Sequence, residues 1–399
     1  MNERIVLHID VNNAFLSWTA VEMLKNNHPI DIRKTYAVIG GDENMRKGVI
    51  LAKSIPCKEK GIITGETLYT ARRKCPNLKV YKGNHEIYHK YSNLMYNYLL
   101  QYSPYIERYS IDECFIEYTS SKKLFGDPIK LAHKIKEDIK NKFGFTVNIG
   151  IGNNKLQAKM ASDFTKPDKV HTLFNNEIKD KLHPLPIEDL FMIGKSTAKK
   201  LRELNINTIK DLANTDITKL TKYFKSHGKL MWEYANGIDN SPVEYEESEA
   251  KSISSSTVLP FNTNDIEYIK NTLKNLSMQT GKRLRENNLY AQNVHIWIKY
   301  NNFNKYSKQE KYNISFNNDI DIYKNAYNLF IKLWNKEKIR ALCVGVSNLT
   351  KNNNVQLDLF SKNTNTVKTD KLQKVLDEIN KKYNKNIITY ADVKNNKNN

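Results

Sequence analysis

The sequence is poor in cysteine and in long apolar runs. Its four cysteines are scattered and form no C-x-x-C pair, so neither a zinc ribbon nor a disulfide framework is indicated. No apolar run approaches the roughly 20 residues that a membrane-spanning helix needs, and the first residues lead into a short strand rather than a signal peptide. We therefore expect a soluble protein of a reducing compartment, the cytoplasm.

Acidic side chains are the scarcer charged class. The 399 residues include 63 Lys and Arg against 43 Asp and Glu, which gives a formal net charge of +20. This balance indicates a polyanionic partner, with nucleic acid as the first candidate and an acidic membrane surface as the second. A chain of this length is expected to divide into two or more domains, each with its own core.

Three carboxylates stand at the ends of short strand-like segments. Asp10 ends an apolar run, while Asp112 and Glu113 lie between two segments rich in β-branched and aromatic residues, which predicts a hairpin. Side chains alternate along a regular strand, so a bend is needed to aim Asp112 and Glu113 at one point. If the first strand lies beside this hairpin, the three carboxylates converge and require cations. Magnesium suits such hard oxygen ligands.

The motifs Asp10-Val11-Asn12 and Ser110-Ile111-Asp112-Glu113-Cys114-Phe115 resemble the palm of Y-family translesion DNA polymerases, the DinB- and UmuC-like enzymes. The resemblance covers most of the chain. It implies an α+β, multidomain right-hand polymerase with a ferredoxin-like palm, small fingers, a helical thumb and a little-finger DNA-binding domain. The implied bounds are 1–24 and 78–168 for the palm, 25–77 for the fingers, 169–240 for the thumb, 241–251 for a linker, 252–350 for the little finger and 351–399 for a tail.

The same resemblance implies a two-metal active site. Asp10 and Asp112 would bridge two Mg²⁺ ions, joined by the carbonyl of Val11, and Glu113 would complete the ion that activates the primer 3′-hydroxyl. Two such ions stabilise both the attacking and the leaving oxygens. A catalytically silent scaffold tethered to a clamp and a two-metal nuclease are the alternatives. The intact carboxylates argue against the scaffold, and the order of fingers, thumb and little finger argues against the nuclease.

Phe15 stands five positions after Asp10, where the family carries an aromatic steric gate against the ribose 2′-hydroxyl. The more common fate of a phenylalanine on an amphipathic helix is the core. The doublet Asn12-Asn13 adds a second alternative, because a shift by one residue would put Leu16 in the gate position.

Lysines are implied to bind the incoming triphosphate. Lys58 stands where the family has an arginine and keeps the charge without the bidentate fork, although a solvated surface lysine remains the alternative. Lys166, before Pro167, matches the family's triphosphate-contacting lysine, and Lys159 is a weaker candidate. Lys155, Lys159 and Lys166 fall on one face of an expected helix, and a basic stripe usually faces solvent.

The segment around Gly194 and Lys195 resembles a helix-hairpin-helix, in which backbone N–H groups bind a DNA phosphate. Met192 replaces the first glycine of the usual Gly-Ile-Gly turn, and a helix-turn-helix in a structural bundle is an equal alternative. Beyond an acidic linker the pattern predicts a β-α-β-β-α-β domain that resembles the little finger. Its expected strands are 252–259, 294–300, 310–316 and 340–346, and its expected helices are 265–287 and 322–335.

The tail contains Gln356-Leu357-Asp358-Leu359-Phe360, which resembles the bacterial sliding-clamp-binding peptide. Gln356, Leu357, Leu359 and Phe360 would make the contacts. Apolar residues at helical spacing between 372 and 383 predict a short amphipathic helix. The expected partners are therefore primer-template DNA, a deoxynucleoside triphosphate (dNTP) and the clamp, with no membrane, and the enzyme is expected to be a monomer.

Overall fold

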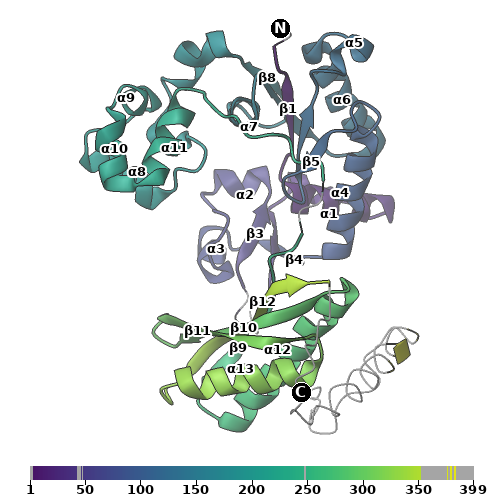
Figure 1. Cartoon of the computed structure of the whole chain (residues 1–399). Coiled ribbons are helices and arrows are strands. Elements are labelled where there is room, and N and C mark those ends of the chain that lie inside the picture. Colours follow the sequence, from purple (N-terminus) through teal and green to yellow (C-terminus); the bar gives the residue numbers. More distant parts are fainter. Residues whose placement is uncertain are drawn as a thin grey trace. The chain divides into compact units, whose positions relative to one another are not determined.

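The computed structural model describes residues 3–42, 46, 48–246 and 249–351, together with Val375, Glu378, Ile379 and Lys382. The chain forms two compact units, residues 1–41 with 48–247 and residues 42–47 with 248–399 (Figure 1). The peptide expected at 356–360 lies outside the described residues. Within the described part, no helix is long and apolar enough to cross a membrane.

The first unit is built around a five-stranded sheet with the order β5-β6-β1-β7-β8. Helices α1, α4 and α6 pack on one face, where Trp18, Tyr88 and Phe145 are fully buried in the largest core. A fourth helix, α7, contacts β7, β8 and β1 and contributes nothing to that core, so it lies on the other face. The elements are β1 (Val6–Val11), α1 (Ala14–Lys25), α4 (His85–Leu99), β5 (Ile106–Arg108), β6 (Glu113–Glu117), α5 (Lys122–Phe125), α6 (Pro128–Phe143), β7 (Val147–Gly152), α7 (Lys155–Asp163) and β8 (Val170–Leu173).

A small three-stranded sheet follows α1, with the order β3-β2-β4. Its last strand, β4 (Lys79–Lys82), pairs in parallel with β2 (Ala37–Gly40). The expected return to the palm at residue 78 is therefore wrong, because this strand completes the small sheet. The other elements are η1 (Ile32–Lys34), β3 (Ile50–Lys53), α2 (Ile55–Glu59) and α3 (Leu68–Lys74).

A group of short helices forms the rest of the first unit (Figure 1). The expected start of this thumb-like part at residue 169 is wrong, because β8 is hydrogen-bonded to β7 in the large sheet. The helical part follows β8 and has a core of its own. Its elements are η2 (Asn175–Glu177), η3 (Ile178–Leu182), η4 (Ile187–Asp189), α8 (Lys195–Glu203), α9 (Ile209–Ala213), α10 (Ile217–Phe224) and α11 (Ser226–Ala235).

The first half of the expected linker packs on the large sheet rather than forming a solvated connection. Val243 is buried, and the backbone N–H of Glu244 donates to Glu107 of β5 at 2.8 Å. Tyr245 meets Tyr105 edge to face, with 4.9 Å between ring centroids. The prediction of a linker failed here because Val243 and Tyr245 are single apolar residues among acidic ones and show no periodic pattern in the sequence.

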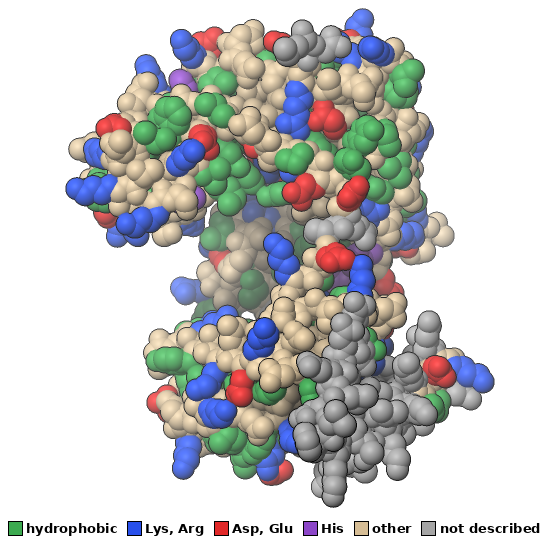
Figure 2. All heavy atoms as spheres, in the orientation of Figure 1, with side chains coloured by type: hydrophobic (Ala, Val, Ile, Leu, Met, Phe, Trp, Pro, Cys, Tyr) green, Lys and Arg blue, Asp and Glu red, His purple; other side chains and the backbone are tan. Residues whose placement is uncertain are grey.

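The second unit has the predicted β-α-β-β-α-β order. Its antiparallel sheet has the order β11-β10-β12-β9, and both helices bury their apolar sides against one face. On β10 the side chains of His295, Trp297 and Lys299 alternate with core residues, so they point to the opposite face. Lys and Arg side chains are spread over the view in Figure 2. The elements are β9 (Ser252–Thr263), α12 (Ile266–Glu286), β10 (Tyr290–Tyr300), β11 (Lys305–Phe316), α13 (Asp319–Leu333) and β12 (Ile339–Thr350).

Candidate active site

The predicted carboxylates meet at the centre of the large sheet. Asp10 on β1 lies opposite Glu113 on β6, and on its other side opposite Asn148 on β7. Asp112 stands at the bend between β5 and β6, where its carbonyl oxygen accepts a hydrogen bond from the backbone N–H of Val11 at 3.1 Å. Paired residues of adjacent strands point to the same face, so Asp10, Glu113 and Asn148 form one row.

Helix α7 reaches this row because two glycines of β7 let it approach. A Cβ atom at Gly150 would lie 2.0 Å from the carbonyl oxygen of Ala158, and one at Gly152 would lie 2.5 Å from the Cβ of Gln157. Such distances exclude any larger residue unless the helix moves. The glycines thus allow α7 to cover the face that carries the carboxylates.

The lysines of α7 and the following loop do not form the solvent-facing stripe that is usual for such a pattern. Lys155 pairs with Glu107 at 2.6 Å, and Lys159 pairs with Glu113 at 2.9 Å. Helix α7 ends at Asp163, so the expected helix through residue 166 is too long. The Nζ of Lys166 contacts the carboxylate of Asp10 from the loop. Two of the three predicted triphosphate lysines, Lys159 and Lys166, are therefore at the carboxylate site.

The electrostatics of the three carboxylates differ. Burial raises the pKa of Asp112, and the charges of Asp10 and Glu113 raise it further, against a hydrogen bond from Ser110. Burial alone would also raise the pKa of Glu113, but His8 and Lys159 lower it to about 2. A raised pKa on one carboxylate among like charges indicates a site that would accept positive charge.

His8 and Ser162 were not found from the sequence. His8 is fully buried beneath Glu113, with Nε2 at 3.2 Å from a carboxylate oxygen and Nδ1 at 2.8 Å from the hydroxyl of Ser162. Burial lowers the pKa of His8, although the hydrogen bond to Glu113 opposes that shift. The position of His8, two residues before Asp10 on a strand, was the available signal, because such residues share a face.

The donor set fits divalent cations by chemistry. Among the described residues, no three His, Cys, Asp or Glu side chains are arranged as a ready metal cluster. Instead, the ammonium groups of Lys166 and Lys159 neutralise Asp10 and Glu113. Clustered carboxylates and a backbone carbonyl are the hard oxygen ligands that Mg²⁺ takes. The residues that could hold such ions are Asp10, Val11, Asp112 and Glu113.

Phe15 and Leu16, the two candidates for the gate, differ in their surroundings. Phe15 is half-buried and stacks on Tyr88 of α4, with 4.4 Å between ring centroids. Leu16 is fully buried in the cluster of the small sheet. Before them, Asn13 adopts a left-handed backbone with φ of 52° and donates to the carbonyl oxygen of Lys53 on β3 at 2.5 Å. Asn13 thus ties the start of α1 to the small sheet.

Lys58 lies exposed on α2, and Ile55 at the start of the same helix is also exposed. Lys58 is close enough to Lys53 to act on its charge, because burial and then the charge of Lys58 lower the pKa of Lys53. Lys58 and Lys53 thus put two positive charges near each other at the small sheet.

The hairpin turn before α8 accommodates its departure from the motif. Met192 adopts a left-handed backbone with φ of 71°, the region that glycine enters most easily. Ile193 is buried, and Gly194 caps α8 with Lys195 as an exposed first residue. Within the described residues, no side chain caps this helix start. The turn therefore keeps the shape of the motif although its first glycine is replaced.

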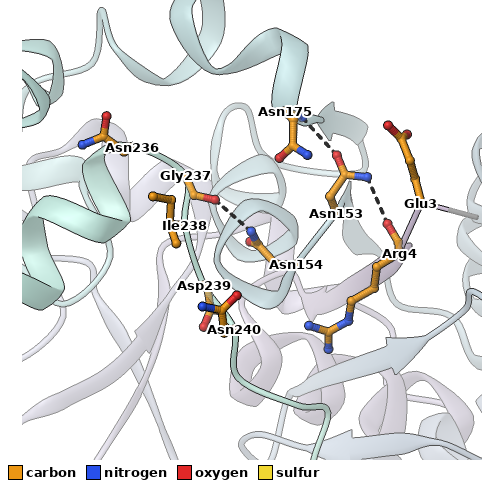
Figure 3. Close-up of a pocket in the computed structure, with 10 residues that line it drawn as sticks. All are labelled: Glu3, Arg4, Asn153, Asn154, Asn175, Asn236, Gly237, Ile238, Asp239 and Asn240. Atoms are coloured by element: carbon orange, nitrogen blue, oxygen red, sulfur yellow. Dashed lines mark hydrogen bonds between the residues drawn. The ribbon is translucent and has the colours of Figure 1, made fainter. Parts of the chain in front are cut away.

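A polar pocket of about 390 Å³ lies where the helical part returns to the sheet (Figure 3). Asn154 donates to the carbonyl oxygen of Gly237 at 2.8 Å, and Asn153 donates to that of Arg4 at 3.0 Å. Asn154 also accepts from the N–H of Gln157 in the first turn of α7. These contacts fix the start of α7, and the pocket walls do not include the three carboxylates.

Comparison with protein families gives matches along most of the chain. The impB/mucB/samB family matches residues 9–163, its C-terminal domain matches 250–359, and the helix-hairpin-helix motif of the same family matches 175–206. Two solved structures are similar at 24% identity, each covered completely and over 87% of this chain. They are a chimeric Y-family DNA polymerase, with a TM-score of 0.75, and DinB from Sulfolobus solfataricus, with a TM-score of 0.58.

Full-length relatives point the same way. A DNA polymerase IV of Clostridium acetobutylicum is 48% identical over 385 residues, which is 96% of this chain and 97% of the relative. A DNA polymerase IV of Acetivibrio thermocellus is 36% identical, again over 96% of this chain and over 95% of the relative. The chain therefore belongs to the impB/mucB/samB family and is a DinB-like DNA polymerase of the Y family.

Proposed function

We propose that Asp10, Asp112 and Glu113 hold two Mg²⁺ ions and that this centre adds deoxynucleotides to a primer opposite damaged template bases. The observation that carries the proposal is the row in which Glu113 pairs with Asp10 while Asp112 adjoins Val11 at the bend. Asp10, Asp112, Glu113 and the carbonyl of Val11 would hold the ions beside the primer 3′-hydroxyl. Bound ions stabilise the attacking and the leaving oxygens.

Lys166 and Lys159 are proposed to serve the triphosphate. In the structure each ammonium neutralises a carboxylate of the row. When cations neutralise those carboxylates, the ammonium groups can turn to phosphate oxygens without leaving a charge unpaired. Lys58 would add positive charge from the small sheet, together with Lys53. Phe15 is proposed to close the ribose side of the nucleotide site, because it projects from α1 five residues after Asp10.

DNA contacts are proposed at two places, each within its own unit. In the first unit, the N–H groups at Gly194 and Lys195 would bind a backbone phosphate at the start of α8. In the second unit, the sheet face opposite the helices carries His295, Trp297 and Lys299, and the Nζ of Lys305 lies 4.4 Å from the centre of the Trp297 ring. Such a face suits contacts to the DNA backbone.

A sliding clamp is proposed as the protein partner, through Gln356, Leu357, Leu359 and Phe360, and the enzyme is proposed to act as a monomer. The support for the clamp is the sequence pattern, since the peptide lies outside the described residues. Light scattering of the purified full chain would test the monomer. A mass of twice the chain's 46.5 kDa would contradict it.

Primer extension on an intact and an abasic template tests the proposed activity. We expect addition of deoxynucleotides on both templates with Mg²⁺ and none with EDTA. Labelled primer-template without dNTPs tests the two-metal nuclease in parallel. Shortening of the primer in that reaction would support the nuclease. If the primer were extended on the intact template but not on the abasic one, synthesis opposite damage would be contradicted.

A further inference from the structure

Asn148 is a buried amide in the row of catalytic carboxylates, and the proposed mechanism does not use it. It is fully buried on β7, opposite Asp10. Its Nδ2 donates to the carbonyl oxygens of Ser162 at 3.0 Å and Thr165 at 2.6 Å, and its Oδ1 accepts from the N–H of Lys169 at 3.3 Å. One side chain thus joins the end of α7 to both ends of the loop that follows.

Asn12 extends this network to the end of β1. Its Nδ2 donates to Oδ1 of Asn148 at 3.1 Å, and its own Oδ1 accepts from the N–H of Asp168 at 2.9 Å. Asn12 is itself fixed, because its N–H donates to the carbonyl oxygen of Thr146 at 2.9 Å and its carbonyl oxygen accepts from Ser17. All the donors and acceptors of the Asn148 amide are therefore used within the chain.

The loop held in this way carries Lys166. The Nζ of Lys166 contacts Asp10 and lies 2.7 Å from Asp163. A lysine has a flexible four-carbon stem and a compact charge, so the place of its ammonium depends on where the backbone beneath it is held. Thr165 and Asp168, which flank the Lys166-Pro167 pair, are the residues that the two asparagines bind.

We propose that Asn12 and Asn148 are positioning residues that hold the loop at 164–169 so that Lys166 reaches the triphosphate of the incoming nucleotide. The proposal rests on the proposed role of Lys166. Only an amide fits at Asn148, because a carboxylate would present acceptors to two carbonyl oxygens and an alanine would leave them without donors. Lys136 and Lys140 pair with Asp168 from α6 at 3.0 and 2.8 Å, so the loop keeps a second anchor when the amides are lost.

Steady-state kinetics on primer-template DNA test the proposal, because they show whether each variant changes KM for the dNTP or kcat. We expect Lys166→Ala to raise KM for the dNTP about tenfold or more, the usual effect of losing a hydrogen bond to a charged group. Asn148→Ala should raise KM in the same direction and change kcat less. In the Lys166→Ala background, Asn148→Ala should raise KM no further, because it acts through that lysine.

Hydrogen exchange of the segment 164–170 supplies a readout that needs no activity. The N–H groups of Asp168 and Lys169 should exchange faster in Asn148→Ala, and that of Asp168 faster in Asn12→Ala. If Asn148→Ala does not fold, both the kinetics and the hydrogen exchange can be measured on Asn12→Ala. That variant removes the hydrogen bonds from Asn12 to Asn148 and to the N–H of Asp168. Tyr98→Phe is the control, because it deletes a palm hydrogen bond to Asp138 on α6 and should leave KM and loop exchange unchanged.

Two results would overturn the positioning role. The first is that Asn148→Ala raises KM by the same factor in the wild type and in the Lys166→Ala background. The second is that hydrogen exchange of the segment 164–170 is the same in Asn148→Ala as in the wild type. A different result would overturn only the role of Lys166, namely an unchanged KM in Lys166→Ala. In that case faster exchange in Asn148→Ala would still show that the Asn148 hydrogen bonds hold the loop at 164–169.

Discussion

Glu113 lies directly opposite Asp10 across two antiparallel strands, and each carboxylate contacts a different lysine. Glu113 contacts Lys159 on α7, while Asp10 contacts Lys166 on the loop beyond that helix. One helix and its loop therefore supply the compensating charges for two strands that are more than 100 residues apart in the sequence. A substitution that moves α7 away from β7 should therefore displace the lysines that contact Asp10 and Glu113.

Gly150→Ala tests that dependence. The new Cβ would lie 2.0 Å from the carbonyl oxygen of Ala158 and 2.4 Å from the amide nitrogen of Ser162, so α7 would have to move. We expect a loss of about 1–3 kcal/mol in the free energy of unfolding together with a fall in kcat. Gly83→Ala is the control, because its nearest neighbour would be the Tyr88 hydroxyl at 3.5 Å. Equal melting temperatures for the two variants would contradict the tight contact.

The lowered pKa of Glu113 predicts how stability changes with pH. With a pKa near 2 in the fold and 4.5 as the ordinary value, Glu113 stabilises the fold above pH 4.5, and this contribution is lost as the pH falls towards 2. Urea unfolding in EDTA should show Glu113→Gln less stable than the wild type at pH 7, by up to about 3 kcal/mol. The difference should shrink at pH 3.5. A constant difference would mean that the charge of Glu113 is not what stabilises the fold.

The steric gate is tested by ribonucleotide incorporation. Phe15→Ala should admit ribonucleotides, because the ring is proposed to occupy the space that a 2′-hydroxyl needs. The stacking of Phe15 on Tyr88 makes a loss of stability the competing effect, so Tyr88→Leu, which removes the same stacking and leaves the Phe15 ring in place, is the control. If incorporation rises instead in Leu16→Ala, the gate lies one residue further along the chain.

The clamp peptide is tested by Leu359→Ala combined with Phe360→Ala. Each apolar anchor would contribute roughly 1.5–3 kcal/mol in a hydrophobic pocket, before the cost of ordering the tail. Synthesis on a short primer should be unchanged, and stimulation by a loaded clamp should disappear because tethering is lost. A fall in basal activity or stability of the double variant would show that the segment packs on the body of the protein.

Strand and helix patterns predicted the parts of the site that lie on regular elements. Asp10, Asp112 and Glu113 came together as expected, because a buried apolar strand and a hairpin leave few ways to pair. The second unit followed from its alternation of strands and helices. The ends of α7 and of the small sheet were missed, because Lys166 and β4 are placed by contacts distant in sequence and not by local periodicity.

The polar network around the carboxylates could not be predicted for a related reason. His8, Asn12 and Asn148 are single polar residues in or beside apolar strands, and on the sequence alone such residues have no visible partner. Their roles depend on Gly150, which lets α7 approach the sheet. A glycine in a strand signals a close approach of the backbone, but it does not say which helix comes near.

The central claim is that Asp112 and Glu113 perform chemistry and that DNA affinity comes from elsewhere. We would measure Mg²⁺-dependent nucleotide addition and DNA binding side by side for the wild type, Asp112→Ala and Glu113→Ala. Each variant should lose more than about a hundredfold in the rate of addition, since metal ligation supplies several kcal/mol. DNA binding should stay nearly intact, because the net charge of +20 supplies the phosphate affinity. Substantial nucleotide addition by both variants would contradict the account.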